Sequence, residues 1–300
     1  MNIAFYPTPQ NNTKPRFSIL IPTWNNLALV ELCVRSIQKN STFAHQIVLH
    51  INDGSDGTLE WARKQGLDFS YSPQNVGICY ACNAAFALSK ADYIVYMNDD
   101  MYACPGWDAQ LWAAIESYAK NDFYFSATMI ERVDEGSKFV ACPHNFGDSV
   151  ANFQEQQLLQ NYAALAIPDW QGANYPPSVM HRHYWQLIGG FSTEFSPGMY
   201  SDPDICMKLW QVGVRNFRGI GNSLVYHFMS KSIGRVKKNN GSKQFLQKWG
   251  MSSHTFQKYY LRFTNYAGEV AYKGILSDPT PTLSFKMAQL LGRLKLILQL

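Results

Sequence analysis

The chain has 300 residues, of which 46% are hydrophobic and 16% charged, and the charged share is below the roughly 25% of an average soluble domain. This composition excludes an intrinsically disordered chain, a collagen and a coiled coil. The formal net charge of +4 is unevenly spread, because residues 228–300 hold 12 Lys and Arg against 2 acidic residues, whereas residues 1–227 are net acidic. We therefore expect the C-terminal part to meet an anionic partner.

Strands and helices alternate through the first hundred residues. Strands are predicted at 17–21, 46–51, 69–71 and 93–97, and helices at 25–40, 58–65 and 78–89. The runs FSILI and YIVYM are continuously apolar, as is typical of strands buried on both faces. The alternation predicts an α/β fold with a doubly wound, mostly parallel sheet and flanking helices.

The pattern is weaker after residue 108. We predict a helix at 109–119, a strand at 123–129, an irregular stretch at 136–170 with a helix at 154–164, a helix at 202–212 and a strand at 222–227. Helices are predicted again at 243–249, 254–263 and 283–300.

The last predicted helix is amphipathic. One side of the helix is apolar and consists of Leu283, Met287, Leu290, Leu291, Leu294, Ile297 and Leu298. The polar and basic residues Lys286, Gln289 and Arg293 lie on the opposite side. Two interpretations stay open, namely a helix lying on an anionic membrane and a helix packed on the body or on another subunit.

Targeting signals and cysteine patterns are uninformative. The N-terminus lacks a basic region followed by an apolar stretch, and no run approaches the roughly 18 apolar residues that span a bilayer. Cys79 and Cys82 form a CxxC without a second pair that would complete a zinc site. We expect buried free thiols, a cytoplasmic location and no nucleic-acid partner.

Polar residues follow all four predicted strands of the first half. The strands end in PTWN, NDGSDG, PQNVG and NDD. A turn alone would explain NDGSDG, since Asp, Gly and Ser are ordinary turn formers. In open parallel sheets, however, ligands bind at the carboxyl ends of the strands, so four polar tips on one edge indicate a binding site.

Asp99 and Asp100 are adjacent carboxylates directly behind an apolar strand. Such a pair is costly unless a cation or hydrogen-bond donors neutralise it, and Mg²⁺ or Mn²⁺ prefers oxygen ligands. The alternative is a helix cap in a solvated loop. Because neither GxxxxGK[ST] nor GxGxxG follows the first strand, a metal-bridged diphosphate is the favoured mode of phosphate binding.

A set of ordered segments resembles the family 2 glycosyltransferases of the GT-A fold. The segments are FSILIPTWNN, INDGSDGT, NVGICYACNAAF, YIVYMNDDM, WQGANYPPSVMHRHYWQLIGGFSTEFSP, YSDPDICMKLWQVG and VYHFMSKSIGR. The resemblance implies a GT-A domain at 1–235, with a nucleotide-binding half at about 17–108 and an acceptor half at about 109–235. Residues 236–300 would be a basic helical C-terminal extension.

The resemblance also implies the donor and metal residues. The nucleotide would contact Pro22, Thr23, Asn25, Asp53, Asn75, Gly77, Asn83 and Asp99. Asp53 would accept the imide N–H of uracil or thymine, and Asp99 would reach the ribose. Mn²⁺ or Mg²⁺ would bind Asp100 and His227.

On the acceptor side, the Glu-Asp pair usual in the family appears as Ser201-Asp202. The resemblance implies that Asp202 is the catalytic base. Without the resemblance, its position at the start of a predicted helix would indicate an N-terminal helix cap. Asp204 is expected to cap the helix or face solvent. Four further residues are implied near the diphosphate or acceptor: Lys231, Arg235, Trp170 as an aromatic platform and Gly190 as a close backbone approach.

The expected activity is metal-dependent, inverting transfer of a sugar from a UDP- or dTDP-sugar to a hydroxyl of a glycan or lipid-linked acceptor, as in cell-surface polysaccharide synthesis. One alternative is a sugar-1-phosphate nucleotidyltransferase, which would want a Gly-rich loop where this chain reads PTWNNLALVE. Another is a non-catalytic nucleotide-sugar binding protein, which the missing Glu keeps open.

Overall fold

The computed structural model describes residues 2–9, 14–229, 239–263, 265 and 271–297. Its strands are β1 (Ala4–Tyr6), β2 (Phe17–Trp24), β3 (Gln46–Asn52), β4 (Asp68–Ser72), β5 (Tyr93–Tyr96), β6 (Met101–Ala103), β7 (Phe123–Ile130), β8 (Val140–Ala141), β9 (Trp170–Gln171), β10 (Ser178–His181) and β11 (Asn216–His227). Within the described residues they form one eleven-stranded sheet in the order β1-β4-β3-β2-β5-β10-β7-β11-β6, with β8 beside β7 and β9 beside β11.

The sheet consists of two parallel blocks joined by an antiparallel strand. Strands β4, β3, β2 and β5 run parallel to one another, and β7 runs parallel to β11. Strand β10 lies between the blocks, antiparallel to both β5 and β7. The predicted α/β class is confirmed, and the carboxyl ends of β2, β3 and β5 lie on one edge as the parallel prediction requires.

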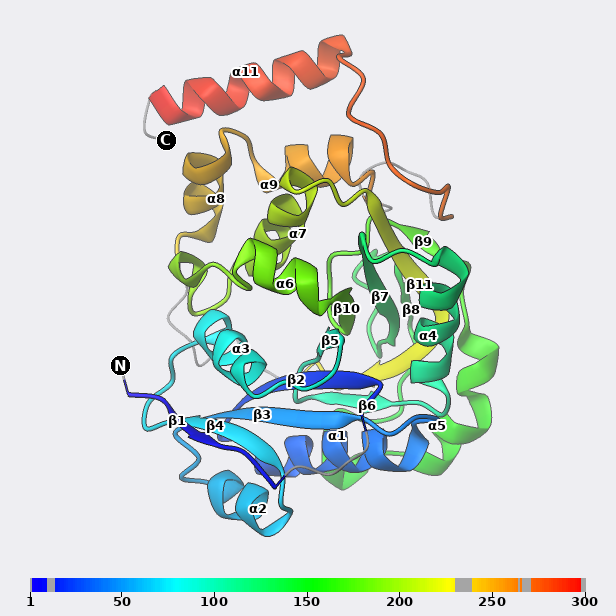
Figure 1. Ribbon diagram of the computed structural model, residues 1–300. Helices are drawn as coiled ribbons and strands as arrows, with labels where there is room; N and C mark the ends of the chain where they lie inside the picture. Colours follow the sequence, from blue (N-terminus) through cyan, green and yellow to red (C-terminus); the bar gives the residue numbers. More distant parts are fainter. Residues whose placement is uncertain (1, 10–13, 230–238, 264, 266–270, 298–300) are drawn as a thin grey trace.

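Helices cover both faces of the sheet. They are α1 (Leu27–Asn40), α2 (Thr58–Lys64), α3 (Ile78–Ala87), α4 (Trp107–Tyr118), α5 (Glu155–Asn161), α6 (Arg182–Ile188), α7 (Ser201–Gln211), α8 (Gly241–Trp249), α9 (Ser253–Thr255) and α11 (Leu283–Ile297), with short helical turns at Val150–Asn152, Tyr162–Leu165, Thr193–Phe195 and Phe256–Tyr260. Figure 1 shows α3, α6 and α7 on one side of the sheet and α1 and α2 on the other.

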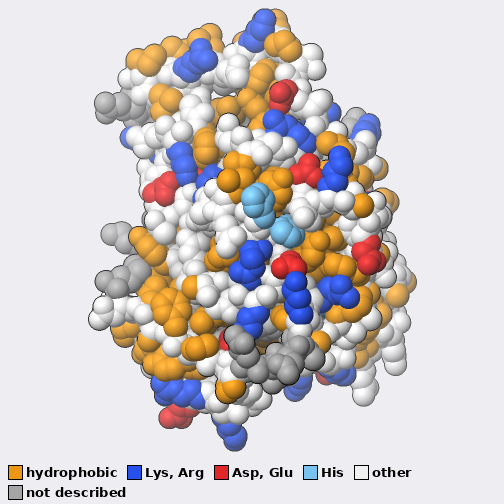
Figure 2. All heavy atoms as spheres, in the orientation of Figure 1, with side chains coloured by type: hydrophobic (Ala, Val, Ile, Leu, Met, Phe, Trp, Pro, Cys, Tyr) orange, Lys and Arg blue, Asp and Glu red, His pale blue; other side chains and the backbone are white. Residues whose placement is uncertain are grey.

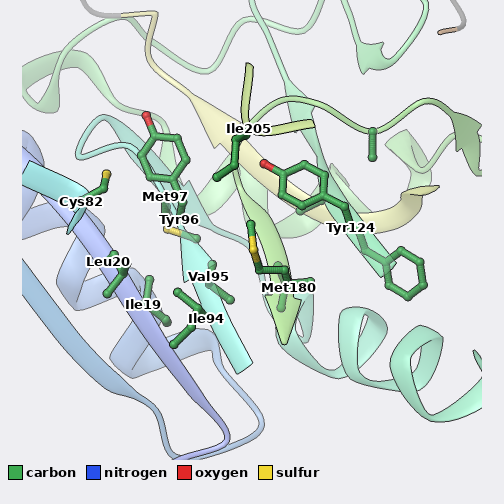
Figure 3. Packing of buried hydrophobic residues seen from close by; sticks show 14 of the residues in the cluster. Ile19, Leu20, Cys82, Ile94, Val95, Tyr96, Met97, Tyr124, Met180 and Ile205 are labelled. Atoms are coloured by element: carbon green, nitrogen blue, oxygen red, sulfur yellow. The ribbon is translucent and has the colours of Figure 1, made fainter. Parts of the chain in front are cut away.

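Apolar spacing decides which side of each helix is buried. In α1, Val30, Cys33, Val34 and Ile37 recur every three or four residues and all are buried. The core between sheet and helices is continuous across the two parallel blocks, as Figure 3 shows where Ile205 of α7 packs near strands β5, β10 and β7.

The C-terminal segment shares this core. Phe245, Phe256, Leu261 and Phe263 are buried in the same hydrophobic cluster as the strands. The predicted boundary between residues 235 and 236 lies outside the described residues, and the segment beyond it packs onto the domain. Helix α11 crosses α8 and α9 at the far end of the molecule from α2 (Figure 1).

All six cysteines are free, five of them buried and Cys142 partly exposed, close to the prediction. No helix in the described part of the chain is both long enough and apolar enough to cross a bilayer.

Candidate functional site

A buried amide holds the first strand ends together. Asn52, the last residue of β3, donates from Nδ2 to the carbonyl of Thr23 over 3.2 Å, and its Oδ1 accepts from the backbone N–H of Val76 at 2.8 Å. The ends of β2 and β3 and the loop after β4 are therefore fixed relative to one another. The sequence analysis did not give Asn52 a role, although it is the first polar residue after a buried strand.

Asn25 and Asp53 are brought together at this edge. Nδ2 of Asn25 donates to Oδ2 of Asp53 over 2.8 Å. Both residues have left-handed backbones, with φ of 45° and 63°. Such conformations cost on the order of 1–3 kcal/mol each and cluster at ligand sites. Pro22 and Thr23 lie just behind them in β2, and the buried Thr23 hydroxyl has no partner among the described residues.

Asp56 explains the shape of the loop after β3. Its Oδ2 accepts from the N–H of Leu27 at 2.7 Å, and its Oδ1 accepts from the hydroxyl of Thr58 at 2.6 Å. Partial burial alone would raise the pKa of Asp56, but these hydrogen bonds outweigh it and lower the pKa. Asp56 thus anchors the starts of α1 and α2, whereas Asp53 bonds to Asn25.

The loop before α3 is shaped by a contact inside the protein. Oδ1 of Asn75 accepts from the N–H of Gly77 at 2.9 Å. Gly77 has φ of 79°, and the position of a Cβ there is occupied by Ser196 and Pro197. Asn75 and Gly77 therefore hold the loop before α3 against residues 196–197.

Asn83 joins α3 to the turn after α6. Its Nδ2 donates to the carbonyl of Phe191 over 2.8 Å, and its Oδ1 accepts from the Phe191 N–H at 2.9 Å. Asn83 and Trp185 also fill the space where a side chain on Gly190 would lie. Internal packing thus explains why residue 190 is a glycine, and its expected approach to the acceptor stays a prediction. The Asn83 amide holds this turn, and its contacts give no support to a nucleotide role.

His227, Asp100 and Glu131 meet at the ends of neighbouring strands. Nε2 of His227 lies 3.5 Å from Oδ2 of Asp100, and Nδ1 lies 2.8 Å from Oε1 of Glu131. The backbone holds this arrangement, because the N–H of Phe228 donates to the Asp100 carbonyl over 3.0 Å. The sequence predicted Asp100 and His227 together but missed Glu131, whose only signal was its place directly after the apolar strand β7.

The environment of His227 favours positive charge. Burial opposes protonation of this imidazole, but the hydrogen bonds and charges of Asp100 and Glu131 outweigh burial and raise its pKa to about 10. A divalent cation satisfies the same two carboxylates, and a carboxylate on the far nitrogen is the usual support for a metal-binding histidine.

The donor set fits a divalent ion. Ligands about 2.1 Å from a Mg²⁺-sized ion stand about 3 Å apart, close to the separation of Asp100 and His227. No three His, Cys, Asp or Glu side chains in the described ranges form a complete metal site. The remaining ligands of such an ion commonly come from water and substrate phosphates.

Asp202 is an unpaired carboxylate in the first turn of α7. It is partly buried, and within the described residues no donor bonds to it. Burial raises the pKa of Asp202 to about 7. A carboxylate with its pKa near neutrality and no structural partner is suited to accept a proton.

Tyr96 links Asp202 to the acidic triplet. Burial is the main cause of the raised pKa of Tyr96, and the charges of Cys82 and Asp202 add to it. The Tyr96 hydroxyl donates to Oδ1 of Asn98 over 2.8 Å. Tyr96 thus feels the charge of Asp202 and is bonded to the Asn98-Asp99-Asp100 triplet, at the carboxyl end of β5.

Asp204, two residues further on, is structural. It is fully buried, and its Oδ1 accepts from Nε1 of Trp249 at 2.8 Å and lies 2.9 Å from Nζ of Lys248. The expectation that Asp204 caps the helix or faces solvent is wrong, because α8 covers it.

Trp170 is also buried rather than exposed. It is 1% exposed, donates from Nε1 to the Thr128 hydroxyl over 3.0 Å and packs on Gly219. The expected aromatic platform is therefore wrong, since neither ring face is free for a sugar. Lys231 and Arg235 lie outside the described residues.

Asn174 is a polar residue that the sequence analysis overlooked. It is 0% exposed, and neither atom of its amide has a partner among the described residues. The preceding residue, Ala173, accepts a hydrogen bond from Sγ of Cys206, one turn after Asp202 in α7. An unsatisfied buried amide costs about 1–3 kcal/mol, so a site for a ligand or water is expected there.

Comparison with known proteins shows what the sequence is similar to. The sequence profile described as Glycosyl transferase family 2 matches residues 18–139. An uncharacterised protein of Sinorhizobium fredii is 25% identical over 247 residues, 73% of this chain and 25% of that protein. An uncharacterised glycosyltransferase of Rickettsia bellii is 25% identical over 130 residues, 42% of this chain and 18% of that protein. The chain thus spans a quarter or less of these relatives.

Solved structures share the fold at low identity. TarS of S. aureus in complex with UDP-GlcNAc superimposes with a TM-score of 0.54 and 13% identity, covering 81% of this chain and 65% of TarS. A mannosyltransferase of Pyrobaculum calidifontis in complex with GDP-Man and Mn²⁺ gives a TM-score of 0.52 and 16% identity, covering 82% of this chain and 64% of that one. The match to the family 2 profile covers residues 18–139, and the architecture of the chain is that of glycosyltransferases with the GT-A fold; together they support a glycosyltransferase.

Proposed function

We propose that this chain transfers a sugar from a nucleoside diphosphate sugar to an acceptor hydroxyl with inversion at the anomeric carbon. The observation that carries the proposal is Asp202, a carboxylate that takes no hydrogen bond from the described residues and has its pKa near 7, in a chain whose residues 18–139 match the family 2 profile. A base of this kind is what direct displacement by a hydroxyl needs.

The donor nucleotide lies at the ends of β2, β3 and β5. Asn25 orients Asp53 by a hydrogen bond to one carboxylate oxygen. The second oxygen, which takes no hydrogen bond from the described residues, accepts the imide N–H of a uracil or thymine base. Thr23 offers its unpartnered hydroxyl, and Asp99 reaches the ribose. TarS binds UDP-GlcNAc on the same fold, which supports a uridine donor.

Asp100 and His227 would hold a divalent ion, Mn²⁺ or Mg²⁺. Glu131 accepts from Nδ1 of His227, which keeps Nε2 directed at Asp100. When bound, the ion offsets the negative charge of the diphosphate as it leaves. The structural neighbour from Pyrobaculum calidifontis is in complex with Mn²⁺, which supports this choice of ion.

Asp202 removes the proton from the acceptor hydroxyl as its oxygen attacks the anomeric carbon. The new glycosidic bond forms on the face opposite the leaving group, and the bond from that carbon to the diphosphate oxygen breaks. The nucleoside diphosphate takes the electron pair, and Asp202 keeps the proton until solvent accepts it. A single displacement needs no covalent intermediate.

The acceptor is a glycan or a lipid-linked sugar of the kind used in polysaccharide synthesis. Lys231 and Arg235 remain predictions for the diphosphate, and the cytoplasm remains the predicted location.

A panel of UDP-, dTDP- and GDP-sugars tests the proposal. Specific donors raise the melting temperature by mass action. Incubation with Mn²⁺ then releases the nucleoside diphosphate, by transfer or by slow hydrolysis. A binding protein would saturate without turnover, and a nucleotidyltransferase would instead release pyrophosphate from a nucleoside triphosphate and a sugar 1-phosphate; either result would overturn the proposal.

A further inference from the structure

Helix α11 is fastened to the body by one of its faces. Phe285 is 6% exposed, and its ring lies 5.1 Å from the ring of Tyr259 and 5.8 Å from that of Tyr260. Gly292, two turns on, is buried close to the carbonyl of Gly250. These contacts fix the rotation of the helix about its own axis.

The opposite face of α11 is apolar and exposed. It consists of Leu283, Met287, Leu290, Leu291, Leu294 and Ile297, whose exposed fractions lie between 43% and 76%. At about 100° per residue these side chains occupy an arc of roughly 120°, centred opposite Phe285 and Gly292. We call this set the outer face. Leu298, which the sequence placed on the same stripe, lies outside the described residues.

Cationic residues border the outer face. By helical position, Lys286 and Arg293 stand along one margin and Lys295 along the other, and α11 contains no acidic residue. Figure 2 shows basic and hydrophobic side chains intermingled along the end of the molecule where α11 lies. The excess of basic over acidic residues extends through residues 228–300, which hold 12 Lys and Arg and 2 acidic residues.

We propose that α11 is an interfacial helix whose outer face lies in an anionic lipid bilayer. An apolar stripe flanked by Lys and Arg is suited to this position, because the stripe enters the acyl boundary while the cations reach the phosphates. A second copy of this chain is the poorer occupant, since it would place two like-charged margins against each other. The inference does not depend on the proposed glycosyl transfer.

Flotation with vesicles tests the proposal on the full chain. We expect binding to vesicles of phosphatidylcholine with phosphatidylglycerol and much weaker binding to phosphatidylcholine alone. Lys286→Gln/Arg293→Gln/Lys295→Gln should weaken binding by roughly five-fold for each charge removed. Leu290→Ser/Leu294→Ser should weaken it by at least about ten-fold, because both leucines leave the acyl boundary.

The matched control is Leu187→Ser on α6, which removes an apolar side chain of similar exposure, 54%, far from the outer face. It should bind like the unchanged protein. Melting temperatures of the α11 variants should change little, since Leu290 and Leu294 are 57% and 43% exposed. If the leucine variant nevertheless melts lower, the charge variant, which removes no apolar side chain, tests the proposal. Equal binding by all variants, or no binding by the unchanged protein, would overturn the proposal. So would a dimer in solution that the leucine changes convert to monomer without any vesicle binding.

Discussion

Asp202 and Asp204 occupy the same turn of α7 in opposite environments. Asp202 takes no hydrogen bond from any donor in the described part of the chain, and burial raises its pKa to about 7. Asp204 is enclosed by Lys248 and Trp249 from α8. The sequence assigned Asp202 to catalysis by resemblance but could not reveal the burial of Asp204, because its partners lie more than forty residues away.

Replacing Asp204 by alanine should destabilise the fold. The change leaves the Lys248 ammonium with Glu194 as its remaining carboxylate partner and the Trp249 N–H without its acceptor, so we expect a loss of about 2 kcal/mol in the free energy of unfolding. Urea denaturation measures this loss. Asp278→Ala is the control, because Asp278 pairs with Arg215 while 79% exposed and should cost under about 1 kcal/mol. Equal effects of the two variants would show that Asp204 is not a structural anchor.

Because of Asp202, the free energy of unfolding should decrease as pH rises. Its folded pKa of about 7 exceeds the ordinary value of 3.8, so the folded state binds more protons than the unfolded state between these two values. Stability from the protonated carboxyl is full below pH 4 and is lost as pH rises through 7. Asp202→Asn should therefore melt higher than the unchanged protein at pH 8 and at nearly the same temperature at pH 4. A variant that melts lower at pH 8 would contradict the raised pKa.

At the scale of the secondary-structure elements, the proposed metal site lies where the ends of β7 and β11 meet Asp100, just before β6. Glu131→Gln keeps the size of the side chain but removes the charge that supports Nδ1 of His227. We expect Mn²⁺ affinity in the presence of UDP to fall by about 10–100-fold, as is usual for such supporting residues. Titration calorimetry or electron paramagnetic resonance of bound Mn²⁺ measures it directly. Unchanged affinity would remove Glu131 from the site.

Long apolar elements could be predicted from the sequence, and short ones could not. The first four strands of the parallel block and their helices follow from hydrophobic spacing, and their polar ends located the edge of the site. Strand β10 (Ser178–His181) was missed because four residues carry little periodicity and its place between β5 and β7 depends on both neighbours. Asn52, Glu131 and Asn174 were missed for a related reason, since their roles depend on partners distant in the chain. Trp170 was misread because aromatic character alone does not show burial.

At the scale of the whole molecule, residues 239–263 belong to the domain and α11 is an addition to it. A chain ending at Pro281 loses the contacts that α11 makes with the body, chiefly through Phe285, Gln289 and Gly292, and should fold with a slightly lowered melting temperature. A chain ending at Asn239 loses Phe245, Phe256, Leu261 and Phe263 from the core and should not fold, because each costs about 2–5 kcal/mol. Circular dichroism melting compares the two. A stable fold of the shorter chain would show that the C-terminal segment is an independent extension.

The central claim is that Asp202 is the base for glycosyl transfer, and its kinetics test that claim most directly. With a donor found by the nucleotide-sugar panel, Asp202→Asn should lower the transfer rate by about 10²–10⁴-fold while donor affinity stays unchanged. The unchanged protein should gain activity with pH around a midpoint near 7, and the variant should not show this rise. An Asp202→Asn enzyme with the full transfer rate and the same pH profile would contradict the account.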